Sequence, residues 1–200
     1  MSPKKVTELC RFAFGSLLTP KANPYGKVQY DAGVVLTEKD SQSIFEAIEE
    51  ALDTYRDGPR GKDLPPNDKL NMPWKQSTKK NDNGEKEVVP GEFLWVFKRS
   101  HTWKTKSGEE QRNTPPLIYD SMGRIVQDIT EIPNGSTGKV IYEVGIYNNM
   151  GNSGVTLRLI GFQIAELAEM SGLELQPIEG GTFVAEAEDA VADINSLLRG

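Results

Sequence analysis

The chain has 200 residues, enough for one domain with appendages, and 37% of them are hydrophobic, which suffices for a core. A single cysteine excludes an internal disulfide and a cysteine-based zinc site, and a reducing compartment is the expected setting. The net charge of −6 is uneven, because eight acidic residues and one basic residue follow position 165 and the rest of the chain carries +1. The body is therefore free to have a basic face.

The first half of the chain predicts two strands and a helix. Residues 4–14 and 27–36 have the apolar pattern of strands, and 16–26, with two prolines, is expected to be a loop. A helix follows, capped by Thr37 or Asp40. Its apolar face, at helical spacing, comprises Ile44, Phe45, Ile48, Leu52 and Tyr55.

Residues 56–92 form a long polar insertion that we expect to be a functional or mobile loop, anchored at Trp74. The pattern then returns to β. It predicts strands at 93–99, 117–119, 139–147 and 155–167, with a charged hairpin at 101–114 and a flexible turn at 148–154. One helix among five or more strands predicts a small barrel, and a sandwich is the competing architecture.

No stretch carries a recognisable catalytic motif. The single histidine, His101, has no evident nucleophile or orienting partner, and no phosphate-binding loop or EF-hand is present. We expect no enzyme activity, no cofactor and no metal ion; a metal-dependent nuclease is a remote alternative. Residues 1–5 precede no apolar segment and the longest apolar run is 93–97, so neither a signal peptide nor a membrane span is expected.

Aromatic and basic residues alternate between positions 93 and 112, where the net charge is +3. If Leu94 and Val96 face the core, the opposite face of the strand exposes Trp95, Phe97 and Arg99. Exposed rings can stack on nucleobases, at roughly 1–3 kcal/mol for each base, and the basic residues can follow the phosphates. The reverse assignment, with the aromatic residues in the core, remains open.

Four stretches, in chain order, point to one family. They are a strand leading into a capped helix at 26–40, a basic ribbon and turn at 104–123, a strand with two tyrosines at 139–147, and a closing strand at 155–167. This set resembles the single-stranded DNA-binding proteins of T7-like and related tailed bacteriophages.

The resemblance implies a mainly β oligonucleotide/oligosaccharide-binding (OB) barrel over residues 1–170, with one inserted helix and a long polar loop. It implies an acidic tail over 171–200. It also implies sequence-independent binding of single-stranded DNA during phage replication, recombination and repair, in the cytoplasm of the infected bacterium. The implied partners are DNA polymerase and helicase–primase, reached through the tail, and a second copy of the chain in a homodimer.

Some candidate DNA-binding residues follow from the resemblance. Tyr147 matches a tyrosine of the family and Phe97 aligns near an aromatic position, and the family's basic positions are matched by Lys4, Lys5, Lys104 and Lys106. The pattern of aromatic and basic residues adds three more, namely Trp95, Arg99 and Trp103.

The C-terminus departs from the family, whose tail is longer, more acidic and ends in an aromatic residue. Here the chain ends Leu-Leu-Arg-Gly, and Val184, Val191 and Ile194 have the spacing of one helical face. This departure leaves the family's homodimer and its exchange of tails between DNA grooves open. The alternative function is a structural or protein-interaction barrel with no nucleic-acid role.

Overall fold

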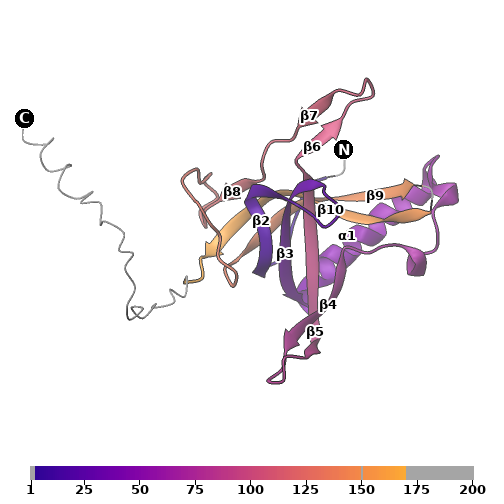
Figure 1. Cartoon of the computed structure of the whole chain (residues 1–200). Coiled ribbons are helices and arrows are strands. Elements are labelled where there is room, and N and C mark those ends of the chain that lie inside the picture. Colours follow the sequence, from indigo (N-terminus) through magenta and orange to yellow (C-terminus); the bar gives the residue numbers. More distant parts are fainter. Residues whose placement is uncertain (1–2, 150, 170–200) are drawn as a thin grey trace, which may run out of the picture. The chain divides into compact units, whose positions relative to one another are not determined.

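The computed structural model describes residues 3–149 and 151–169, and the predicted tail at 171–200 lies outside them. This part of the chain is mainly β, with one α-helix and two short 3-10 turns (Figure 1). The strands are β1 (Lys5–Val6), β2 (Cys10–Ala22), β3 (Val28–Thr37), β4 (Trp74–Lys80), β5 (Lys86–Ser100), β6 (Thr102–Lys104), β7 (Glu110–Arg112), β8 (Leu117–Tyr119), β9 (Thr137–Asn149) and β10 (Asn152–Glu166). The helix α1 spans Glu38–Asp57.

Five strands are joined in a ring of pairings. β2 pairs with β3, β3 with β5, β5 with β10, β10 with β9, and β9 returns to β2. The β5–β10 pair is parallel and the other four are antiparallel. β1, β4 and β8 extend the sheet from β9, β5 and β10, respectively. The prediction of a mainly β body with one helix between strands is thus confirmed.

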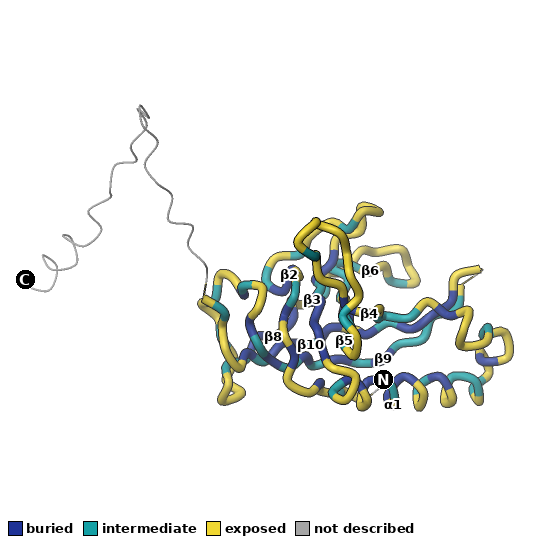
Figure 2. The backbone as a smooth tube through the Cα atoms, turned by 90° about the horizontal axis from the view of Figure 1, so that it is seen from below, coloured by how far each residue is buried: buried dark blue, intermediate teal, exposed yellow. Residues whose placement is uncertain are grey.

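The core lies where alternate residues of these strands meet. The residues of β3 that belong to the hydrophobic core are Tyr30, Ala32, Val34 and Leu36, and β5, β9 and β10 contribute alternate residues in the same way. Figure 2 shows the buried residues following the central strands, whereas the hairpin tips are exposed. The period of two therefore separates an inner face, packed with apolar side chains, from an outer face.

The helix begins as predicted. Thr37 is its N-cap, and the Thr37 hydroxyl accepts a hydrogen bond from the backbone N–H of Asp40 at 3.2 Å. Ile44, Ile48 and Leu52 are buried against the strands, as their spacing indicated. The helix thereby covers one part of the inner core.

The predicted orientation of the strand at 93–99 is wrong. Trp95 and Phe97 are both 0% exposed, and it is Lys98 that points to solvent. The Phe45 ring of α1 lies 5.0 Å from that of Trp95, and the Trp95 indole donates to Ser41 Oγ at 2.9 Å. The alternation is reversed because packing α1 on the sheet requires large side chains on that face of β5. Neither aromatic residue can stack on a base from this position.

Two predicted loops contain strands. Residues 74–80 of the polar insertion form β4, which pairs with β5, so this stretch is one arm of a hairpin. β2 extends to Ala22 through much of the expected loop at 16–26, leaving a short turn at 23–27. The charged hairpin predicted at 101–114 is confirmed as the β6–β7 ribbon, which projects from the body (Figure 1).

Candidate nucleic-acid interface

The outer face of β2, β3 and β5 forms a shallow groove. It consists of three hollows of about 390, 430 and 480 Å³, and Phe14, Lys75, Val96 and Lys98 each line two of the three. The hollows therefore adjoin one another across the sheet. We call them together the outer groove.

Four aromatic side chains line the outer groove, namely Phe14, Tyr25, Trp74 and Tyr147, and two of them, Phe14 and Tyr147, lie close to a glycine of a neighbouring strand. The Phe14 ring covers Gly33 of β3, where a Cβ atom would collide with it. The Tyr147 hydroxyl end lies close to Gly154 of β10 in the same manner. Phe14 is 42% exposed, and Tyr147 lines the hollow that contains Val96. Glycine on the neighbouring strand thus leaves room for the Phe14 ring and for the hydroxyl end of Tyr147 close to the sheet. Aromatic side chains that line a groove can stack on bases.

A β-bulge brings Phe14 to this face. Phe12 pairs with Val34 and Phe14 with Gly33, so Ala13 is an extra residue in β2. Without the bulge, Phe12 and Phe14 would point to the same side of the strand. The extra residue leaves Phe12 in the core, at 2% exposure, and turns Phe14 outward.

The groove is lined by more basic than acidic side chains. The five basic ones are Arg11, Lys21, Lys75, Lys79 and Lys98, and the two acidic ones are Asp31 and Glu92. Within the described residues, no carboxylate lies within 4.0 Å of Lys98 Nζ. Aromatic faces combined with unpaired cations are the features that non-specific single-strand binding uses.

Of the predicted site residues, Tyr147 lies in the outer groove. Arg99 does not, because its guanidinium donates to the Thr114 carbonyl at 2.7 Å and to Thr114 Oγ1 at 3.0 Å. Burial lowers the pKa of Arg99, and the nearby charge of Arg158 adds to this effect. Arg99 therefore ties the end of the ribbon segment to β5.

The predicted ribbon residues form a second exposed group. Trp103 and Lys104 are on β6 and Lys106 is in the tip of the hairpin, all three exposed to solvent. Trp103 is 50% exposed. The ribbon starts directly after β5, beside β3, since the His101 N–H donates to the Val28 carbonyl.

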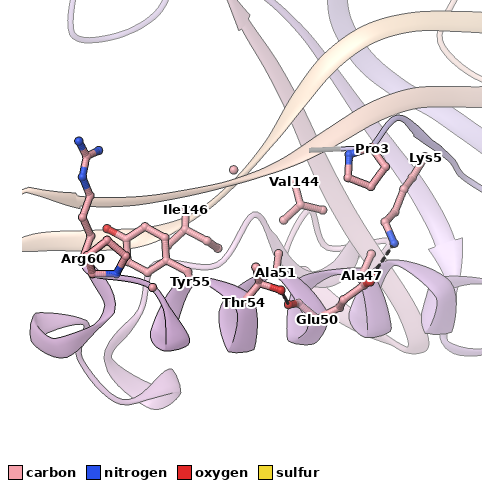
Figure 3. Close-up of a pocket in the computed structure, with 13 residues that line it drawn as sticks. Pro3, Lys5, Ala47, Glu50, Ala51, Thr54, Tyr55, Arg60, Val144 and Ile146 are labelled. Atoms are coloured by element: carbon pink, nitrogen blue, oxygen red, sulfur yellow. Dashed lines mark hydrogen bonds and ion pairs between the residues drawn. The ribbon is translucent and has the colours of Figure 1, made fainter. Parts of the chain in front are cut away.

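The N-terminal lysines lie elsewhere. Lys4 is exposed, and Lys5 in β1 pairs with Glu50 of α1 at 2.9 Å, next to a pocket between α1 and β9 (Figure 3). The hydrogen bond from Lys5 holds the pKa of Glu50 below its usual range. Val144, Ile146 and the helix supply the apolar walls of this pocket. None of its lining residues belongs to the outer groove.

Sequence reasoning missed Phe14, Lys75 and Lys98 as site residues. Phe14 reads as one of an apolar cluster, and the bulge that exposes it leaves no mark in the sequence. Lys75 was placed in a loop, although it stands opposite Leu94 in the β4–β5 pair. The run of lysines at 75, 79 and 80 was the available signal for a basic strand.

Solved structures with a similar arrangement are known. The single-stranded DNA-binding protein gp2.5 of bacteriophage T7 superposes with a TM-score of 0.58 at 19% identity, over 88% of this chain and 98% of that one. The fold is that of phage single-stranded DNA-binding proteins. The corresponding protein of bacteriophage Enc34, solved with single-stranded DNA, has a TM-score of 0.58 at 13% identity, over 83% of this chain and 88% of its own. The resemblance seen in the four stretches is thus confirmed in the structure.

The likeness is not detectable in the sequence as a whole. No protein-family model matches the chain, and no curated protein matches it. Two further properties concern the described residues alone. None of their helices is long and apolar enough to cross a bilayer, and nowhere in residues 3–149 and 151–169 do three metal-ligating His, Cys, Asp or Glu side chains come together.

Proposed function

We propose that this chain is a non-enzymatic protein that binds single-stranded DNA along the outer groove, with no fixed sequence requirement. Bases stack on Phe14 and Tyr147, and phosphates lie against Lys75 and Lys98. The observation that carries the proposal is the placement of the exposed Phe14 ring and the partly buried Tyr147 side chain in the groove, close to glycines and beside lysines that have no ion-pair partner within the described residues. The ring of strand pairings supports an OB barrel, a fold whose members bind oligonucleotides on this kind of face.

The β6–β7 ribbon is proposed as a second contact with the strand. Trp103 offers an exposed ring, and Lys104 and Lys106 offer charges for the backbone. Lys4 and Lys5 are less suited to this role, because Lys5 is engaged with Glu50 on the helix side.

The biological setting is proposed from the similar proteins. Phage single-stranded DNA-binding proteins share this fold, which supports a role in phage DNA replication, recombination and repair inside the infected bacterial cell. DNA polymerase and helicase–primase are the proposed partners of the acidic segment that follows residue 170, and a homodimer is a further proposal.

The acidic segment is also proposed to compete with DNA. Six acidic residues and one basic residue follow residue 170, an excess of five negative charges, whereas the groove has three basic side chains in excess. Deleting residues from 180 onward should therefore raise affinity for oligo-dT at low salt. Equal or weaker binding by the truncated chain would contradict the competition.

The direct test is binding of a labelled oligo-dT of about 16 nucleotides, within the range that OB folds occupy. We expect micromolar or tighter binding at low salt, weakening steeply as salt rises because counterions are released from the DNA. A matched duplex and a charge-matched polyanion such as heparin serve as controls for plain electrostatic attraction. Absence of a complex with oligo-dT at low salt would contradict the proposal and favour the protein-interaction alternative.

A further inference from the structure

The floor of the outer groove contains a carboxylate where a polyanion is expected to bind. Asp31 lies on the outer face of β3, directly opposite Lys98 of β5. It lines a hollow of about 480 Å³ together with Lys21 and Tyr25. An acidic side chain at this position repels phosphate, so its presence in a DNA groove requires a physical reason.

One oxygen of Asp31 has a structural role. Oδ1 accepts a hydrogen bond from the Ser16 backbone N–H at 2.9 Å and another from Ser16 Oγ at 2.7 Å. These two bonds hold β2 on β3 at the last regular pair before the shift of register between Ser16 and Lys21. They also fix the orientation of the carboxylate.

The other oxygen has no such partner. In the described part of the chain, Oδ2 takes part in no hydrogen bond within 3.5 Å and no ion pair within 4.0 Å. Asp31 is only partly buried, and the hollow above it is open to the groove. Oδ2 is thus an acceptor with no protein donor within hydrogen-bonding distance among the described residues.

Nucleobases differ in the donors that they could offer to this oxygen. Cytosine and adenine each carry an exocyclic amino group, as does guanine, whereas thymine presents carbonyl oxygens on either side of its single ring N–H. A carboxylate accepts from amino groups and is repelled by carbonyl oxygens and by phosphate.

Resting on the proposed function, we propose that Asp31 selects among bases in the outer groove, favouring those with an amino group over thymine. The protein then binds any single strand, but its affinity depends on base composition. The aromatic and lysine contacts supply the general affinity, and Asp31 is the position that discriminates. The site is at the end of the groove near Tyr25, away from the apolar floor formed by Val35 and Leu94.

The test compares dissociation constants for oligo-dC and oligo-dT of equal length in the wild type and in Asp31→Asn. Asparagine keeps one oxygen for Ser16 and replaces the other by an NH₂ donor. The fold is therefore retained, and the group facing the groove changes from a hydrogen-bond acceptor to a donor. Because a hydrogen bond to a charged acceptor is worth about tenfold in affinity, we expect the ratio of the dT to the dC constant to fall about tenfold in D31N.

A matched control distinguishes discrimination between bases from the simple loss of a negative charge. Glu92→Gln also removes one negative charge from the groove, where Glu92 lies 3.8 Å from Arg11. It should tighten binding to both oligonucleotides equally and leave the ratio unchanged. If D31N behaves like E92Q, the carboxylate is only structural and the inference is overturned.

Chemical modification of the DNA provides a test that needs no variant. An oligonucleotide of N4,N4-dimethylcytosine lacks the amino donor and should bind the wild-type protein about tenfold more weakly than oligo-dC. Equal binding of the two would overturn the inference while leaving the proposed function intact. Failure of the wild type to bind any of these strands would instead overturn the proposed function.

Discussion

On one face of β5, Trp95 and Phe97 are fully buried, in contact with α1 and with Tyr142 of β9. On the other face, Val96 and Lys98 line the outer groove. The two faces alternate along the same backbone, yet the face richer in aromatic residues is the one that DNA cannot reach. The rings that line the outer groove come from other segments, among them the exposed Phe14 of β2 and the partly buried Tyr147 of β9. Aromatic content alone therefore does not locate a stacking surface; the position of the core does.

The largest expected effect is on the buried face. Trp95→Ala should lower the free energy of unfolding by about 3–5 kcal/mol, because it leaves a cavity and removes the partner of the Ser41 hydroxyl. Denaturant titration followed by circular dichroism measures this loss. Trp95→Phe, which fills more of the space, should lose less. A stable W95A protein with lost DNA binding would show that Trp95 is a stacking residue after all.

Substitutions on the outer face should weaken DNA binding with little effect on stability. Phe14→Ala and Tyr147→Ala should each weaken oligonucleotide binding by about 1–3 kcal/mol, the value of one base stack. Each should change the free energy of unfolding by less than W95A does. Val88→Ala, which trims an equally exposed apolar residue outside the hollows, is the matched control. Unchanged affinity in both aromatic variants would place the binding site elsewhere.

The basic residues of the outer face should determine how strongly the DNA affinity depends on salt concentration. Lys98→Gln should reduce the slope of log affinity against log salt by about one, as expected for the loss of one phosphate contact. Lys39→Gln, on the exposed side of α1, removes the same charge away from the groove and should leave the slope unchanged. A slope reduced equally by both variants would mean that general attraction, rather than the groove, holds the DNA.

At neutral pH, the smallest effect on stability is expected from the buried titratable groups. Burial raises the pKa of Cys10 to about 12 and that of Tyr142 to about 12. In each case the folded state holds its proton more tightly than the unfolded state, so stability is unaffected below about pH 8 and falls as pH rises toward 12. Cys10 should also resist alkylation at pH 8 unless the chain is unfolded. Rapid alkylation of the native protein would contradict this burial.

The sequence predicted part of this arrangement well. The helix with its Thr37 cap, the ribbon at 101–114 and the two long C-terminal strands all follow from local patterns of polar and apolar residues. Of the candidate site residues, Tyr147 lies in the groove because it belongs to the alternate residues of β9 that point outward. Trp95 and Phe97 did not, because a strand with large apolar residues on both faces gives no local sign of which face is covered.

By itself, the sequence determined the mainly β character, the helix after Thr37, and the separation of an acidic tail from a nearly neutral body, since all of these depend on residues close together in the chain. Only the tertiary structure decided which side of β5 is buried, because that depends on where Phe45 of α1 packs. It also decided that Phe14 is exposed, since a single bulge in β2 reverses the alternation after Phe12. The groove is assembled from strands distant in sequence, and its position therefore depends on how those strands pair.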